Sequence, residues 1–163
     1  PGHAFEWARL MLHLEGGLLR HGEAAPGWLL EDAQGLFHSA TELAWNVDGE
    51  PGLIYTHDWE NQPVVHERMH WTLAEAAATA AALLKRTGDA TYETWYRRFW
   101  DYIDRFLIDR ERGSWWQELD RHNNPSSEIW SGKADLYHAY QATLLPRLPL
   151  SPTMARAIAD GAL

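Results

Sequence analysis

Apolar side chains recur every three or four residues through most of this 163-residue chain, and that spacing restricts its fold more than any other feature. The spacing puts apolar residues on one face of a helix. A first helix is expected to begin near Ala4 and to stop at Gly16-Gly17. Four later segments carry the same pattern: residues 26–46, 68–86, 90–108 and 133–145. The sequence therefore predicts an all-α protein built from antiparallel helix pairs.

Two longer connections interrupt the helices. Residues 52–65 place short extended stretches around a polar turn, which predicts a short β-hairpin or an extended loop. Residues 113–129 predict an irregular segment or a second short hairpin that turns at Asn123-Asn124-Pro125. We therefore expect one helical domain over residues 1–150, with short hairpins in its loops. A tail over residues 151–163 is expected to be a short helix or frayed.

The amino-acid composition restricts the partners and ligands that the chain can have. The chain has 14 lysines and arginines against 23 aspartates and glutamates, with no basic cluster, which argues against a nucleic-acid partner. No run of about 18 apolar residues is present, which argues against a membrane partner. The lack of cysteine rules out disulfides and thiolate metal sites and agrees with a cytoplasmic location. Ten tryptophans suit the binding of sugars, whose apolar faces stack on indoles, although a tryptophan-rich core is expected to explain most of them.

Two histidines are candidates for acid/base chemistry. His3 and Glu6 are three residues apart, so a helix would put them on one face, where the carboxylate can orient the imidazole or bind a substrate hydroxyl. Spacing alone favours a simpler explanation, a solvated pair at a helix start. His138 lies in the middle of an apolar helical stretch, and such a lone histidine is more often a core residue than a catalyst.

A third candidate is His66-Glu67-Arg68-Met69-His70, which matches the H-E-x-x-H pattern of zinc hydrolases. On a helix both histidines would share a face, and Glu67 would activate a water molecule. The preceding Pro63-Val64-Val65 is extended in character, and Glu93 is a poor third ligand because it lacks an acidic partner. A zinc hydrolase is kept as a minor alternative.

Four motifs together resemble the C-terminal half of the N-acylglucosamine 2-epimerase superfamily, over nearly all of the chain up to Pro146. The motifs are His3-x-x-Glu6-Trp7-x-Arg9, His70-Trp71-x-x-x-Glu75, Trp115-Trp116-Gln117-Glu118-Leu119-Asp120 and Gly132-Lys133-x-Asp135-x-Tyr137-His138. The first motif is similar to that of the aldose–ketose isomerase branch, of mannose isomerase and sulfoquinovose isomerase type. The resemblance implies the C-terminal half of an (α/α)6 barrel that holds a sugar in the bowl at one end.

The resemblance also implies roles for individual residues. It implies that His3 and His138 are the acid/base pair, and that the branch needs neither a metal nor another cofactor. Four further residues are implied to contact the monosaccharide: Glu6, Trp71, Gln117 and, with a less certain match, Glu75. We expect His138 to move the proton between two sugar carbons and His3 to assist ring opening, although the two roles can be exchanged.

The expected reaction is an aldose–ketose isomerisation of the mannose-to-fructose type, in which a histidine poised near neutrality moves a proton through an enediolate. A sugar 2-epimerase of N-acylglucosamine type and a sugar-binding protein without catalysis remain alternatives. The family's N-terminal half has no counterpart in these 163 residues. We therefore expect the chain to be an incomplete, inactive fragment that needs the missing half or an oligomer partner to close the bowl.

Overall fold

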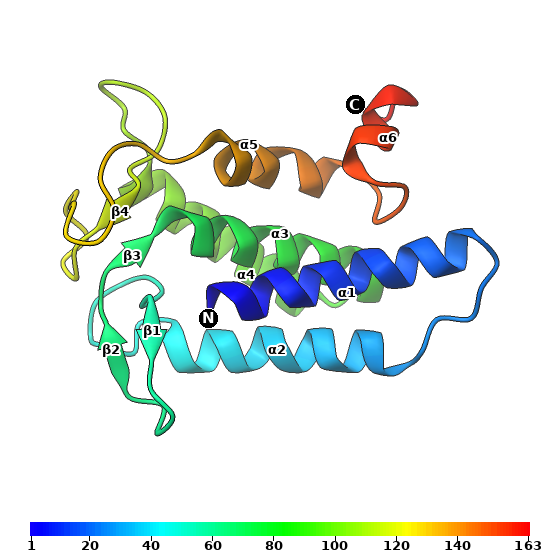
Figure 1. Ribbon diagram of the computed structural model, residues 1–163, viewed down its shortest axis with the longest axis horizontal. Coiled ribbons are helices and arrows are strands. Elements are labelled where there is room, and N and C mark those ends of the chain that lie inside the picture. Colours follow the sequence, from blue (N-terminus) through cyan, green and yellow to red (C-terminus); the bar gives the residue numbers. More distant parts are fainter.

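The computed structural model describes residues 1–163, and helices make up most of it (Figure 1). The helices are α1 (Gly2–Arg20), α2 (Trp28–Ala44), α3 (His70–Thr87), α4 (Ala90–Tyr102), the π-helix η1 (Ile103–Leu107), α5 (Leu136–Leu144), the 3-10 helix η2 (Leu145–Arg147) and α6 (Met154–Ala159). The prediction of an all-α fold is confirmed. None of these helices is both long enough and apolar enough to cross a membrane.

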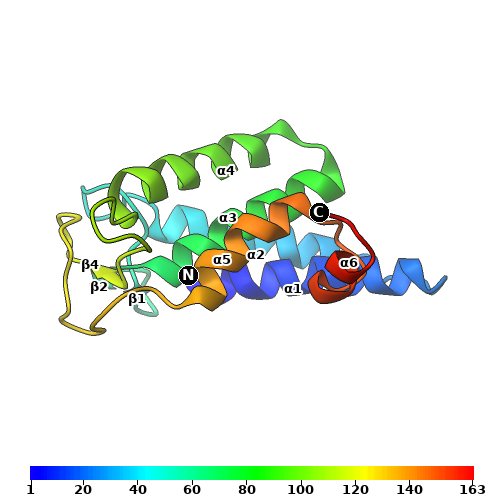
Figure 2. The same ribbon diagram turned by 90° about the horizontal axis from the view of Figure 1, so that it is seen from above.

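Helix packing gives two layers. α3 packs against both α1 and α5, while α2 packs on α1 and α4 packs on α3 (Figure 2). The chain reverses between successive long helices, so α1, α3 and α5 run in one direction and begin at the same end of the molecule (Figure 1). The first turns of these three helices therefore lie close together.

The alanine-rich helix α3 is at the centre. Every residue from His70 to Leu83 except Trp71 is buried, because helices or loops cover it on nearly all sides. A helix that is apolar all round is suited to such a place, and short alanine side chains let its neighbours come close. Phe5, Phe37 and Phe99 fill the space between the layers, with ring centroids 5.6 to 6.3 Å apart.

The tryptophans contribute less to the core than expected. Five lie in the core or pack against it: Trp45, Trp95, Trp100, Trp115 and Trp116. Four are exposed: Trp7, Trp28, Trp59 and Trp130. The core thus explains half of the ten rather than most, and alanine, leucine and phenylalanine do the greater part of the filling.

Two helix limits differ from the sequence prediction. α1 continues through Gly16 and Gly17, because a glycine lowers helix stability by only about 1 kcal/mol and a packed helix absorbs that cost. A Cβ on Gly16 would lie 3.3 Å from the Cβ of Leu150, so the missing side chain lets the C-terminal segment pass closely. α5 begins three residues later than predicted, because the Asp135 side chain caps it by accepting the backbone N–H of His138.

Short strands connect the loops at the end where α1, α3 and α5 begin. β1 (Thr56–His57) and β2 (Pro63–Val65) pair antiparallel, which confirms the predicted hairpin. β3 (Arg68–Met69) pairs with β4 (Glu118–Leu119), a partner about fifty residues away that local sequence reasoning did not predict. The segment that contains β4 turns back at Asn123-Asn124, where Leu119 bridges to Pro125.

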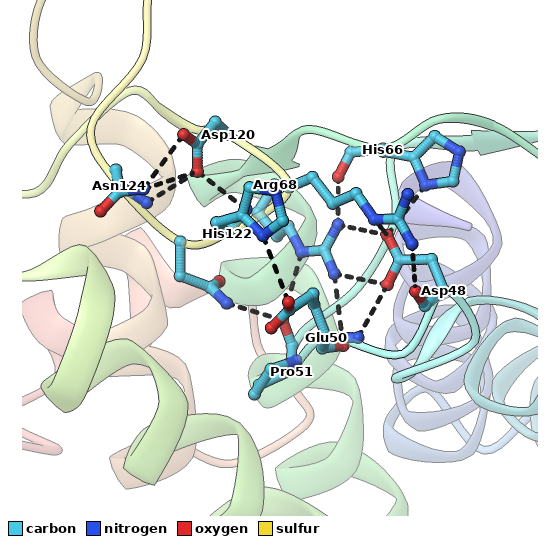
Figure 3. A network of polar contacts seen from close by, with 10 residues as sticks. Asp48, Glu50, Pro51, His66, Arg68, Asp120, His122 and Asn124 are labelled. Carbon is cyan, nitrogen blue, oxygen red and sulfur yellow. Dashed lines mark hydrogen bonds and ion pairs between the residues drawn. The ribbon is translucent and has the colours of Figure 1, made fainter.

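A polar network fixes these loops to one another (Figure 3). The buried Arg68 guanidinium binds both carboxylate oxygens of Asp48, with N–O distances of 2.8 Å, and also donates to the Pro51 carbonyl. His66 contacts the same Asp48 carboxylate at 2.9 Å, and His122 contacts Glu50. Arg68 therefore fixes residues 66–69 in a non-helical segment, of which Arg68 and Met69 form strand β3.

This conformation contradicts the zinc-hydrolase alternative. Residues 66–69 precede the helix instead of forming its first turns, and α3 starts only at His70. His66 bonds to Asp48, whereas His70 bonds to the Gln117 carbonyl and to Asp135. The H-E-x-x-H histidines thus do not share a helix face.

Candidate functional site

The first turns of α1, α3 and α5 surround a cavity of about 380 Å³, together with two loop residues. Its lining residues are His3, Glu6, Trp71, Gln117, Trp130, Tyr137 and His138. Five of the six site residues predicted from the sequence are thus brought together, although Gln117 and His138 are far from His3 along the chain. The sixth, Glu75, does not line the cavity.

His3 and Glu6 come from the start of α1, one turn apart. That start lies directly against Trp71, because Gly2 has no side chain: a Cβ there would be 2.3 Å from the indole ring. The His3 ring centroid is 5.1 Å from that of Trp71. The close contact between α1 and α3 places His3 beside the indole.

His138, from α5, also lies beside Trp71, with ring centroids 5.8 Å apart. Its backbone N–H and its ring Nδ1 both contact the Asp135 carboxylate, at 2.8 and 3.0 Å. A carboxylate only accepts hydrogen bonds, so Nδ1 carries a proton and Nε2 keeps the lone pair. Burial raises the pKa of Asp135, but the hydrogen bonds from His138 outweigh it and lower the pKa to about 2. The helix cap therefore also sets the tautomer of His138.

A second histidine, His70, contacts the same carboxylate from inside the protein. Its Nε2 is 3.0 Å from Asp135 Oδ2, and its Nδ1 is 3.2 Å from the Gln117 carbonyl oxygen. Sequence reasoning did not assign Asp135 a role, although an aspartate three residues before His138 at a helix start is a recognisable cap signal. Tyr137, although part of the fourth motif, was not given a role, and nothing in the sequence marks Trp130.

Glu75 lies one turn beyond Trp71 on α3 and faces α1 instead of the cavity. It binds the Arg9 guanidinium at two points, with N–O distances of 2.7 and 2.9 Å, and both side chains are at most 5% exposed. The pair joins α1 to α3 beneath the cavity. Glu75 therefore affects the site by holding α1, which carries His3 and Glu6, against α3.

The arrangement has the parts needed to move protons on a neutral polyhydroxy compound. Two imidazoles lie next to the same indole ring, and Glu6 and Gln117 offer groups that bind hydroxyls. No lysine or arginine side chain lines the cavity.

Comparison with known proteins agrees with this chemistry. Residues 1–142 match the N-acylglucosamine 2-epimerase (GlcNAc 2-epimerase) family. The chain is 60% identical to a D-mannose isomerase of Pseudomonas cannabina pv. alisalensis over 98% of its length, and 50% identical to one of Thermobifida fusca over 97%. It spans 38% of the length of each of these relatives.

Solved structures show the same fold. A crystal structure of D-mannose isomerase matches with a TM-score of 0.79 at 30% identity, covering 90% of this chain and 36% of that one. Cellobiose 2-epimerase from Spirochaeta thermophila DSM 6192 matches with a TM-score of 0.70 at 16% identity, covering 87% and 37%, and supports the fold alone. The predicted relation to the α/α-barrel fold is confirmed.

Proposed function

Because this chain belongs to the N-acylglucosamine 2-epimerase family, we propose that the protein containing it is an aldose–ketose isomerase of the mannose-to-fructose type. The observation that carries the proposal is that His3 and His138 line one cavity, with their ring centroids 5.1 and 5.8 Å from that of Trp71. The identity with D-mannose isomerases favours isomerisation over epimerisation.

The proton path follows from the tautomer of His138. Its Nδ1 donates to Asp135, so Nε2 is the nitrogen that can take a proton from C2 of the open-chain sugar and return it to C1, while a second proton passes from the C2 hydroxyl to the C1 oxygen. One base on one face of the enediolate is enough for this transfer, and a neutral imidazole titrates in the right range. His3 assists ring opening by moving a proton between the anomeric hydroxyl and the ring oxygen. Glu6, one turn away, orients His3 or holds a hydroxyl.

The substrate is held by stacking and by neutral hydrogen bonds. Trp71 offers an indole face beside the two histidines, and the Gln117 amide can both donate and accept. α3 and α5 direct their N-terminal ends, which carry partial positive charge, toward the cavity. Negative charge develops on the enediolate oxygens, so these helix ends stabilise the intermediate.

Further polypeptide is needed to complete the bowl. Trp7, Leu10 and Leu14 form an exposed apolar row on α1, and Tyr137 and Tyr140 are exposed on α5. Apolar surface of this kind is normally covered in a soluble protein. We propose that the N-terminal half of the family fold, or a second subunit, covers it, and that the 163 residues alone do not turn over sugar. Measurable mannose–fructose conversion by the purified 163-residue chain would contradict this part of the proposal.

The main test is product analysis in deuterated water. It uses a longer protein, in which these residues are joined to the N-terminal half of the family fold. An isomerase produces a ketose with deuterium at C1, whereas a 2-epimerase produces an aldose with deuterium at C2. His138→Gln and His3→Gln should each abolish turnover and keep sugar affinity. His21→Gln, on the exposed far end of α1, is the matched control. Sugar binding without turnover by the unaltered protein would instead support a binding protein.

A further inference from the structure

The buried histidine behind the cavity, His70, has both ring nitrogens directed at acceptors. Nδ1 is 3.2 Å from the Gln117 carbonyl oxygen, and Nε2 is 3.0 Å from Asp135 Oδ2. A neutral imidazole carries one N–H and one lone pair. In the neutral form, one lone pair would therefore face an oxygen atom. The ring is 0% exposed, so solvent cannot relieve that repulsion.

We propose that His70 is held as an imidazolium by the Gln117 carbonyl and Asp135, and that it is a positioning residue for His138. Both of its N–H groups then donate, and no lone pair is opposed. The part of this inference that concerns catalysis rests on the proposed function, whereas the protonation state does not.

The extra proton is placed on His70 and not on Asp135 because of the other bonds to that carboxylate. Asp135 already accepts the backbone N–H and the ring Nδ1–H of His138, and each of these bonds favours its charged form. Burial is the largest effect on the pKa of His70 and lowers it, and the Gln117 carbonyl and the Asp135 charge oppose that effect. An imidazolium is therefore kept only as the partner of an ionised Asp135, and the pair is neutral as a whole.

Few groups surround His70, so the effect of its charge on His138 can be assigned. Two titratable groups face it: Asp135, which caps α5, and His138 in the first turn of that helix. The segment before β4 contributes the Gln117 carbonyl. The His70 and His138 rings meet edge to face, with centroids 5.9 Å apart. A charge on His70 therefore acts on His138 both directly and through Asp135.

The expected consequence is a His138 that is fixed in orientation yet still exchanges its proton. A carboxylate paired with His138 alone would hold a protonated imidazole strongly. Sharing the carboxylate with a cation weakens that hold, while Asp135 keeps Nε2 of His138 as the free nitrogen. In the proposed reaction, this nitrogen takes up the sugar proton and releases it again.

The protonation state can be measured directly. Nitrogen NMR of the longer protein, with labelled histidine, without substrate and with a chelator, should show both ring nitrogens of His70 protonated from pH 6 to 8. His138 should show a protonated Nδ1 and a bare Nε2. The His70 signals are assigned by their loss in His70→Gln, or in His70→Asn if the first variant does not fold. A bare nitrogen on His70 overturns the proposal.

A bound metal ion is the alternative explanation for the close approach of His70, Asp135 and His138. His70, Asp135 and His138 present ligand atoms within 4.8 Å of one another. Two ligands of one tetrahedral zinc ion lie about 3.4 Å apart, compared with 3.0 Å for Nε2 and Oδ2 here. Titration with zinc chloride separates the two cases. Stoichiometric binding that displaces a proton from Nε2 of His70 at micromolar zinc would overturn the imidazolium assignment, and unchanged nitrogen signals support it.

The positioning role has its own test, with two matched variants. His70→Gln can keep a donor toward Asp135 but removes the charge, so the acidic limb of the kcat/KM profile should move up by about 1 pH unit. His70→Asn keeps the donor toward Gln117 and loses the Asp135 contact. It should show the same displacement together with a lower maximal rate. Unmoved profiles in both variants overturn the role. The NMR measurement needs no activity, so it remains informative if the proposed function fails.

Discussion

Arg9 and Glu75 form a two-point ion pair inside the protein, 66 residues apart in sequence, with N–O distances of 2.7 and 2.9 Å. The pair joins α1 to α3 about one turn beyond Glu6 and Trp71, and so helps to place His3 and Glu6 beside the indole.

Replacing Glu75 by glutamine should destabilise the protein strongly. The change leaves the Arg9 charge buried without a partner, which typically costs about 3–5 kcal/mol. Urea unfolding at pH 7 measures the loss. Glu93→Gln breaks the exposed Arg97–Glu93 pair on α4 and should leave the unfolding midpoint unchanged. Equal losses of stability in the two variants would show that burial does not make the Arg9–Glu75 pair more stabilising than the exposed pair.

Asp135→Asn should lower the rate of catalysis and leave the stability of the protein nearly unchanged. Asparagine is as good a helix cap as aspartate, so α5 should keep its start. His70 should lose its extra proton once the carboxylate charge is gone, so no unpaired charge stays buried and the melting temperature should change little. The substitution removes the acceptor that fixes the His138 tautomer, and kcat should fall by about 100-fold or more. Steady-state isomerase assays with the longer protein measure this. Asp160→Asn, on the surface of α6, provides the comparison. A large drop in melting temperature for Asp135→Asn would point to a structural role instead.

The loop network predicts a specific dependence of stability on pH. Burial raises the pKa of Asp48, but hydrogen bonds from Arg68 and His66 outweigh it and hold the pKa well below its usual range. Since the folded-state pKa is depressed, the stabilisation is fully present above about pH 4, the unfolded value, and is lost as the pH falls further.

Asp48→Asn should therefore lower the free energy of unfolding at pH 7 by about 3 kcal/mol or more, because Arg68 loses its buried partner. The difference from the unaltered protein should shrink below about pH 4. Unfolding curves at several pH values measure it. Asp104→Asn, in an exposed pair with Arg110, should show no such convergence. A difference that stays constant with pH would rule out the assigned role of Asp48.

Gly2→Ala should damage the site while leaving the fold intact. The added Cβ would lie 2.3 Å from the Trp71 ring, so the indole must shift away from its place beside the histidines. A displaced stacking face should raise KM by about tenfold. Gly17→Ala, in the same helix with no atom within 4 Å, should instead stabilise the protein by about 0.5–1 kcal/mol. An unchanged KM in Gly2→Ala would mean that Trp71 does not contact the substrate.

Periodicity alone predicted the existence of the helices, because buried faces repeat within each segment. It failed at Gly16-Gly17, where packing of the C-terminal segment outweighs a local preference. It also gave no sign that β3 pairs with β4. That pairing depends on contacts across about fifty residues, which no local pattern encodes.

The candidate site was predictable only in part for a similar reason. Motifs marked His3, Trp71, Gln117 and His138, whose residue types follow from the chemistry. The joint contact of His70 and His138 with Asp135 depends on where α5 lies against α3, 65 residues apart for His70 and Asp135. His70 instead attracted attention through a zinc pattern that the non-helical conformation of residues 66–69 excludes.

The cavity draws its residues from two kinds of backbone. His3, Trp71 and His138 stand on helices that share a tightly packed interior, whereas Gln117 and Trp130 belong to the long connection between η1 and α5. An engineer who wishes to change the sugar accepted should therefore vary the connections and leave the helices alone. Loop libraries at residues 117 and 130 would sample new substrates without disturbing the groups that carry the proton.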